Sequence, residues 1–205
     1  MQYPTYSIEK EIIALGYTNI AGADEVGRGC GSGPVVSAVV RIPQFSVNLL
    51  ENKVKDSKKL SAKKREGLCR LIIQTCDCGI GSIDNRIIDE INILEATKLA
   101  MRLAISEINK VDYVIIDGNF TIKELDIPHH AVVKGDSLSL SIAAASIVAK
   151  VTRDNIMRKL HNQFPLYCWD ENKGYLTKKH LEALNLYGPC EHHRLSFNKV
   201  DNKGV

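Results

Sequence analysis

The sequence predicts an α/β domain in which helices cover a central sheet, with a helical portion at its C-terminal end. Strand-like and helix-like segments alternate along most of the 205 residues. The run Tyr113–Asp117 is apolar until its final aspartate, which is typical of a strand buried on both faces. The segment from Ser139 to Leu160 has helical periodicity and many small residues, which permit close packing on a sheet.

The other elements are predicted from residue periodicity and from start and stop residues. Strands are expected at residues 19–24, 34–41, 79–83, 113–117 and 131–133, the second antiparallel to the first across a glycine-rich turn. Helices are expected at residues 7–15, 61–76, 87–108, 139–160 and 177–187, with Ser61 as the N-cap of the second. No internal repeat or linker divides the sequence, so residues 1–205 are predicted to form one domain, with roughly 160–205 as a helical extension.

Composition excludes several classes of protein. The six cysteines form no CxxC pair, which argues against a zinc site and favours reduced thiols. The N-terminal residues contain no apolar signal region, and no stretch approaches the length of a membrane span. We therefore expect a cytoplasmic protein without a membrane partner.

Charge is distributed unevenly. The formal net charge is only +3, which by itself indicates no particular partner. Basic residues nevertheless crowd the segment from Lys53 to Arg65, where Asp56 is the one acid. Such a cluster is often a solvated surface, but beside a metal site it would contact phosphates.

Four carboxylates, Asp24, Glu25, Asp117 and Asp136, are expected where apolar segments end. A carboxylate at the edge of a core costs on the order of several kcal/mol unless a cation or hydrogen bonds compensate. Mg²⁺ and Mn²⁺ favour oxygen ligands, so the pattern predicts a metal-dependent nuclease. Each acid also has a plainer interpretation: an aspartate after a strand often forms a turn, and Asp136 could cap the helix that starts near Ser139.

Glycines at alternate positions (Gly27, Gly29, Gly31 and Gly33) follow the first two acids and surround Arg28. They match neither GxGxxG nor a P-loop, so a nucleotide-cofactor site is disfavoured. They would let a nucleic-acid backbone approach main-chain N–H groups, although a tight hairpin would also use glycines here. His192 and His193 lack a matching ligand spacing, which favours a structural or surface role.

These motifs together resemble those of ribonuclease HII, the type 2 ribonuclease H family. The resemblance rests on AGADEVGRG, DSKKLS, IIDGN, VKGDSLSLSIAAASIVAKVTRD and NKGYLTKKH, in that order along nearly the whole chain. It implies a ribonuclease H-like fold, with a central mixed sheet flanked by helices and a C-terminal helical extension. It also implies cleavage of the RNA strand of RNA/DNA hybrids and nicking 5′ of single ribonucleotides embedded in duplex DNA, leaving 3′-hydroxyl and 5′-phosphate ends.

The resemblance assigns roles to particular residues. Asp24, Glu25, Asp117 and Asp136 match the catalytic acids that bind two Mg²⁺ or Mn²⁺ ions. The substrate-binding positions of the family fall on Gly27, Arg28, Gly29, Lys58, Lys59 and Tyr175. The implied partners are the hybrid duplex and ribonucleotide-containing DNA, and we expect a monomer without an obligate protein partner.

Two departures from the family pattern are visible. Gly31-Ser32 replaces a larger apolar residue and an alanine, which is expected to loosen the hairpin, and Leu138 replaces a frequent lysine, so one phosphate contact is expected to be absent. Ribonuclease HIII is the close alternative, but it lacks the arginine of GRG and adds an N-terminal domain, for which residues 1–18 leave no room.

Two classes of protein outside this family also compete with the nuclease hypothesis. A non-catalytic nucleic-acid-binding module would use the same basic surface, but it has no need for four converging acids, which would repel phosphate without a metal. An enzyme acting on a small phosphorylated metabolite would use the acids but would have no affinity for a duplex.

Overall fold

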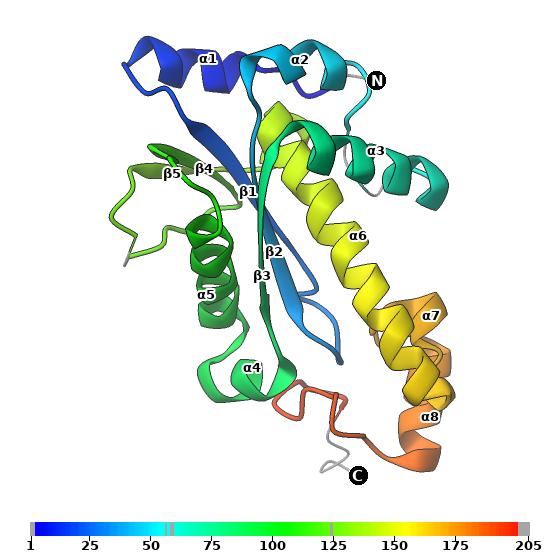
Figure 1. Cartoon of the computed structure of the whole chain (residues 1–205). Helices are drawn as coiled ribbons and strands as arrows, with labels where there is room; N and C mark the ends of the chain where they lie inside the picture. Colours follow the sequence, from blue (N-terminus) through cyan, green and yellow to red (C-terminus); the bar gives the residue numbers. More distant parts are fainter. Residues whose placement is uncertain (1–2, 56, 58–59, 124, 201–205) are drawn as a thin grey trace.

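A five-stranded mixed sheet forms the centre of the computed structural model, which describes residues 3–55, 57, 60–123 and 125–200 (Figure 1). The strand order is β3-β2-β1-β4-β5. β1 pairs antiparallel with β2, and β2 with β3, whereas β1–β4 and β4–β5 are parallel pairs. The strands are β1 (Ile20–Val26), β2 (Val35–Arg41), β3 (Asp77–Ile83), β4 (Tyr113–Asp117) and β5 (His129–Val132).

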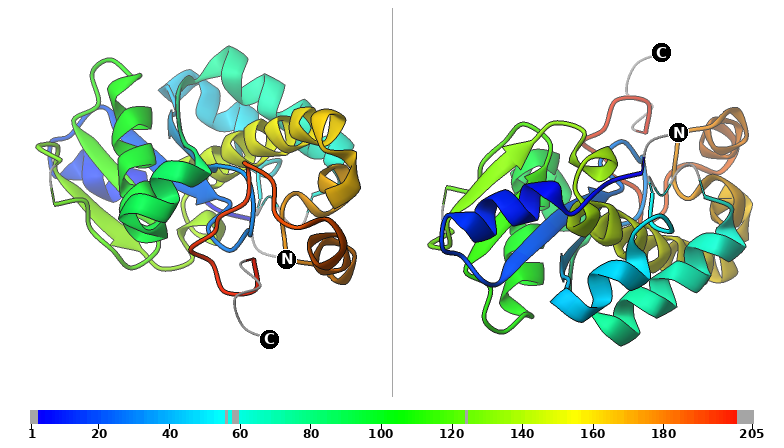
Figure 2. Two further views of the ribbon diagram at one scale, coloured as in Figure 1. Left: turned by 90° about the horizontal axis from the view of Figure 1, so that it is seen from below. Right: turned by 90° about the horizontal axis from the view of Figure 1, so that it is seen from above.

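Helices cover both faces of this sheet. The views in Figure 2 show α5 and α6 on opposite sides of β1 and β2, and α3 packs against α6. The helices are α1 (Ser7–Ala14), α2 (Gln44–Leu50), α3 (Ala62–Thr75), α4 (Asn85–Ile91), α5 (Ile93–Ser106), α6 (Leu140–Gln163), α7 (Trp169–Asn172) and α8 (Lys178–Tyr187), with 3₁₀ turns η2 (Gly135–Ser137) and η3 (Pro165–Tyr167).

Two predictions about the core are confirmed. Val114, Ile115 and Ile116 of β4 are completely buried, as expected for a strand covered on both faces. Ala143–Ala145 of α6 are also completely buried, and their small side chains let this helix lie directly on the sheet.

The observed elements differ from the prediction in several places. The helix expected at residues 87–108 is two helices, separated by Asn92 with a φ of 69°. Its side-chain oxygen accepts hydrogen bonds from the N–H groups of Leu94 and Glu95, so the same residue that ends α4 caps α5. The first strand continues past Asp24 to Val26, because Glu25 still pairs with β2, and α2 was not predicted at all.

The C-terminal elements pack against the second half of α6. Trp169 of α7 and Leu184 of α8 share a buried cluster with Met157 of α6. The tail that follows α8 then returns to the turn between β1 and β2, where His193 forms a β-bridge with Ser32 (Figure 1).

Within the described ranges, no helix combines the length and the apolar character that crossing a bilayer requires.

Candidate active site

Asp24 and Asp117 lie at the same edge of the sheet. β1 and β4 are parallel and Ala23 is level with Ile116, so the next residue of each strand is an aspartate. Asp24 is buried and accepts hydrogen bonds from the N–H of Glu25 at 2.6 Å and from the hydroxyl of Ser146 on α6. Burial, followed by the negative charges of Glu25 and Asp117, holds the pKa of Asp24 well above its usual range.

Glu25 has one satisfied and one unsatisfied carboxylate oxygen. Its Oε1 accepts a hydrogen bond from Arg28 Nη1 at 3.3 Å. Its Oε2 is buried and has no hydrogen-bond partner among the described residues. Burial raises the pKa of Glu25, and the Arg28 charge offsets part of that rise. An unpartnered buried acid oxygen beside two other carboxylates is a position where a cation would stabilise the fold.

Asp136 lies in η2, which the structure connects to Asp117. The N–H of Gly135 donates to Asp117 Oδ1 at 2.7 Å, so Asp136 is one residue from a direct contact with that carboxylate. The interpretation of Asp136 as a helix cap was wrong. Ser139 is the N-cap of α6, and its hydroxyl accepts the N–H of Ile142 at 3.2 Å.

The carboxylates do not yet form a coordination sphere. In the described part of the chain, no three His, Cys, Asp or Glu side chains are gathered at the spacing of a metal site. Adjacent strand residues such as Asp24 and Glu25 start toward opposite faces, and uncompensated like charges repel. All the candidate ligand atoms are nevertheless oxygens, which Mg²⁺ and Mn²⁺ prefer. Glu25 Oε2 accepts no hydrogen bond from the described residues and so could bind a cation. The residues therefore fit a divalent cation, provided that their side chains turn toward it.

Two buried arginines shape the glycine hairpin, which we define as residues 27–34. Arg153 of α6 donates to the carbonyls of Pro34 at 2.8 Å and Ser32 at 3.1 Å. Arg194 donates to the carbonyl of Arg28 at 3.2 Å. Both arginines are completely buried, and sequence reasoning missed both. Arg153 follows the apolar run of α6 and stands among other charged residues, Lys150 and Asp154, so its burial had no local signal.

The two ends of the GRG motif have different surroundings. Gly27 has a φ of +108°, and a Cβ there would lie 2.2 Å from Arg153 Nε, so glycine is required. Gly29 faces open space, and Arg28 is exposed with its guanidinium 5.7 Å from the centre of the Phe120 ring. The tip of the hairpin is therefore accessible to a partner.

The loop that follows α7 brings Tyr175 to the glycine hairpin. The N–H of Gly31 donates to the carbonyl of Gly174 at 2.9 Å, and the Tyr175 hydroxyl forms a hydrogen bond with Cys30. Tyr175 is 44% exposed, so one part of its ring is available for contact. The expectation that Gly31 loosens the hairpin was wrong, because a Cβ at this position would lie 2.5 Å from Leu176 and glycine instead permits tight packing.

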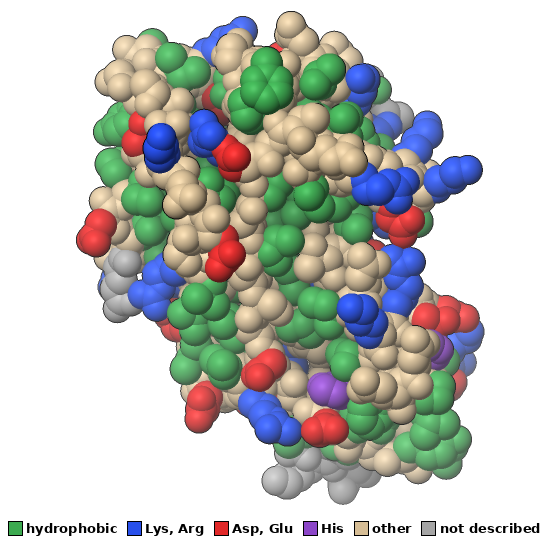
Figure 3. Space-filling view, in the orientation of Figure 1, with side chains coloured by type: hydrophobic (Ala, Val, Ile, Leu, Met, Phe, Trp, Pro, Cys, Tyr) green, Lys and Arg blue, Asp and Glu red, His purple; other side chains and the backbone are tan. Residues whose placement is uncertain are grey.

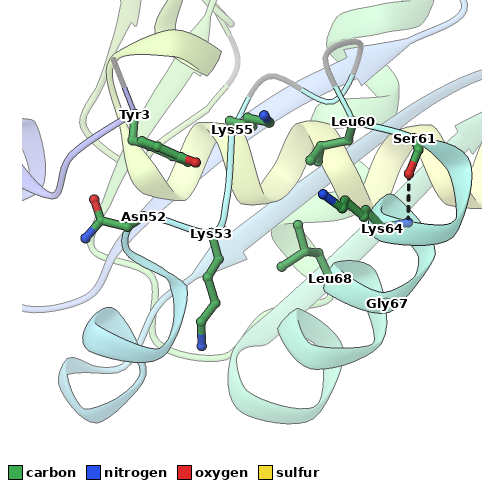
Figure 4. Close-up of a pocket in the computed structure, with 9 residues that line it drawn as sticks. All are labelled: Tyr3, Asn52, Lys53, Lys55, Leu60, Ser61, Lys64, Gly67 and Leu68. Carbon is green, nitrogen blue, oxygen red and sulfur yellow. Dashed lines mark hydrogen bonds between the residues drawn. The ribbon is translucent and has the colours of Figure 1, made fainter. Parts of the chain in front are cut away.

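The basic segment reaches the site through a serine. Ser57 and Ser146 hydroxyls are 3.0 Å apart, and Ser146 also binds Asp24. Lys53, Lys55 and Lys64 line a cavity of about 510 Å³ (Figure 4). Blue side chains gather over α3 in the same part of the molecule in Figure 3. Lys58 and Lys59, predicted to bind substrate, lie outside the described residues.

The model of the family described as Ribonuclease HII matches residues 21–200. The chain belongs to the ribonuclease HII family. The Ribonuclease HII of Wolbachia sp. subsp. Brugia malayi (strain TRS) is 48% identical over 203 residues, which cover 98% of this chain and 97% of that protein. Because ribonuclease HII enzymes cleave the RNA of RNA/DNA hybrids, the chain is a ribonuclease H.

Solved structures confirm the predicted fold. The ribonuclease H2 from Pyrococcus horikoshii OT3 is similar with a TM-score of 0.74 and 27% identity, over 89% of this chain and 95% of that one. The RNase HII in a PCNA:RNase HII complex from Archaeoglobus fulgidus has a TM-score of 0.72 and 27% identity, over 88% and 95% of the two chains. The family and the mixed sheet flanked by helices were thus both predicted correctly.

Proposed function

We propose that this ribonuclease H also nicks duplex DNA 5′ of single embedded ribonucleotides, leaving 3′-hydroxyl and 5′-phosphate ends. One observation carries the proposal: Asp24, Glu25 and Asp117 crowd one sheet edge beside a hairpin whose Arg28 and Gly29 are accessible. Four acids without a cation would repel a phosphate, so this arrangement favours cleavage over simple binding.

Asp24, Glu25, Asp117 and Asp136 would hold Mg²⁺ or Mn²⁺. The chemistry that two such ions would supply when bound is activation of the attacking water and stabilisation of the departing 3′-oxygen. The raised pKa of Asp24 and the unpartnered Oε2 of Glu25 support this assignment, since a nearby cation would relieve both. Ser146 would orient Asp24 through its hydrogen bond, and the N–H of Gly135 would orient Asp117.

Selectivity for ribose would come from the hairpin and Tyr175. The 2′-hydroxyl is the chemical group that distinguishes RNA from DNA at a given nucleotide. Gly27, Arg28 and Gly29 would contact it from the hairpin, and the half-exposed Tyr175 ring would pack against the sugar or base at the RNA–DNA junction. Lys53, Lys55 and Lys64, together with Lys58 and Lys59, would contact phosphates farther along the duplex.

The direct test uses a DNA duplex that bears one ribonucleotide. Wild-type protein should nick it 5′ of the ribonucleotide when Mg²⁺ is present and leave it intact when Mg²⁺ is absent. The Asp117→Asn variant should still bind the duplex but should not cut it, because it lacks one charged ligand. Binding without a nick, in a preparation that cleaves an RNA/DNA hybrid, would overturn the proposed incision at single ribonucleotides, and so would absence of binding to this duplex.

A second test concerns Tyr175. Replacement by alanine should slow incision at the single ribonucleotide more than it weakens duplex binding, because the ring is proposed to orient the junction. The Tyr175→Phe variant, which keeps the ring and loses only the hydroxyl contact with Cys30, is the matched control. An equal loss of rate and affinity in Tyr175→Ala would indicate that the ring contributes affinity alone.

A further inference from the structure

His180 and His193 form a buried pair away from the carboxylates. Their Nε2 atoms are 3.0 Å apart, and their side chains are almost completely inaccessible. His180 belongs to α8, whereas His193 belongs to the tail that contacts the glycine hairpin. The indole N–H of Trp169 points at His180 Nε2 from 3.3 Å. The proposed chemistry uses neither histidine, so the reason for burying two polar rings together requires an explanation.

The hydrogen bonds around the pair permit only one order of tautomers. The backbone N–H of Cys190 donates to His193 Nδ1 at 3.0 Å, so a neutral His193 must carry its hydrogen on Nε2. That hydrogen points to His180 Nε2, which must therefore be an acceptor. His180 then carries its hydrogen on Nδ1, from which it donates to the carbonyl of Tyr175 at 2.9 Å. A series of hydrogen bonds, each donating toward the next group, thus runs from the Cys190 N–H through both rings to the Tyr175 carbonyl.

This series of hydrogen bonds ends at Tyr175, the residue that is proposed to contact the RNA–DNA junction. The tail also holds the hairpin itself, because the N–H of Gly33 donates to the carbonyl of His192 at 2.9 Å. The hairpin in turn donates from Gly31 to Gly174, directly before Tyr175. The tail therefore supports both partners of the Tyr175–hairpin contact.

We propose that His180 and His193 are positioning residues, which hold Tyr175 in register with the glycine hairpin through one fixed tautomeric order. This inference rests on the proposed role of Tyr175 in recognition. Neither histidine would touch the substrate, and both would act through the backbone of Tyr175.

The surroundings of the pair favour neutral rings. A proton added to His180 Nε2 would face two N–H groups, those of His193 and Trp169, and would break the series of hydrogen bonds. Burial lowers the pKa of His193 to about 4 and also lowers that of His180. Among the described residues, the pair has ring contacts with Tyr167 and Trp169 and hydrogen bonds with Tyr175, Cys190 and Asn85, and His192 is its other titratable neighbour; none of these is a carboxylate.

The first experiment measures the tautomers of the wild-type protein directly. Long-range ¹H–¹⁵N correlation spectra of histidine-labelled protein should show His180 protonated on Nδ1 and His193 on Nε2. His193 should not titrate between pH 8 and about pH 5, and the pKa of His180 should lie below its ordinary value of 6.5. The opposite tautomers, or titration of both rings near the ordinary value of 6.5, would overturn the inference without any reference to activity.

The second experiment measures kinetics. His180→Phe removes the hydrogen bond to Tyr175, so kcat at a single ribonucleotide should fall about tenfold with little change in KM, because a small misplacement of an orienting group slows the reacting geometry. His180→Asn can return an amide hydrogen to the Nδ1 position and should recover part of that loss. Circular dichroism and melting curves verify that each variant is folded.

The outcomes separate this inference from the proposed function. Wild-type kinetics in His180→Phe, together with a defective Tyr175→Ala, would overturn the positioning role alone. Wild-type kinetics in both variants would overturn the recognition role of Tyr175 and, with it, the positioning role. If His180→Phe does not fold, His180→Asn and the tautomer measurement still decide the question.

Discussion

Asp24 occupies an environment that opposes its own ionisation. Its side chain is buried and faces the negative charges of Glu25 and Asp117, with two hydrogen bonds as partial compensation. A carboxylate in such a position lowers the stability of the metal-free protein, and its retention is consistent with a trade of stability for activity. The unpartnered Oε2 of Glu25 belongs to the same arrangement.

The Asp24→Asn variant should therefore separate stability from activity. The amide keeps an oxygen for the N–H of Glu25 but carries no charge, so the free energy of unfolding in EDTA should rise by about 1 kcal/mol. Cleavage should be abolished, and Mg²⁺ should stabilise the variant less than it stabilises the wild type. Urea denaturation with and without Mg²⁺ measures these effects, and a less stable variant in EDTA would contradict the argument.

At the scale of elements, the glycine hairpin depends on partners that are distant in the sequence. Arg153 of α6 and Arg194 of the tail donate to its carbonyl groups. The loop after α7 closes over it, with Leu176 against Gly31. These contacts make the hairpin a fixed surface, although a segment with four glycines is flexible in isolation.

Gly31→Ala should destabilise the protein, because its Cβ would lie 2.5 Å from Leu176. Overpacking of this kind typically costs about 1–3 kcal/mol. Adding Leu176→Ala should remove the clash, so the double variant should be more stable than the sum of the single changes predicts. Gly29→Ala is the matched control, since nothing lies within 4 Å of its Cβ position. Equal destabilisation by the two alanines would show that backbone flexibility, and not packing, explains the result.

At the scale of the whole molecule, the site is assembled from segments that are far apart in the chain. β1 and β4 bring their acids together through parallel pairing, and η2 joins them through Gly135. The C-terminal elements contribute Tyr175, the buried histidine pair and Arg194. The stability of the C-terminal region and the geometry of the site are therefore linked.

This linkage predicts a pH dependence of stability. The pKa of His193 is about 4 in the folded protein and ordinarily 6.5, so the unfolded chain binds more protons between these values. The free energy of unfolding should thus fall by about 2–3 kcal/mol as the pH decreases from about 6.5 to about 4. Urea denaturation across this range measures the slope, and His193→Phe should have a shallower one. Identical slopes would show that the pKa of His193 is the same in the folded and unfolded protein.

Local patterns predicted much of the fold. The apolar run of β4, the N-cap of α3 and the small residues of α6 are each readable from neighbouring positions. The break at Asn92 was missed because the helical periodicity continues across it, while the break depends on one residue with positive φ. α2 was missed because only a short apolar pattern marks it.

The sequence by itself determined the family and the α/β class and marked each candidate acid, because each motif is a run of neighbouring residues. Only the tertiary structure decided which of those acids are buried, which arginines hold the hairpin and how the two histidines share their hydrogens. Burial, charge repulsion and tautomer choice arise from contacts between segments that are far apart in the chain. No local pattern of residue types contains that information.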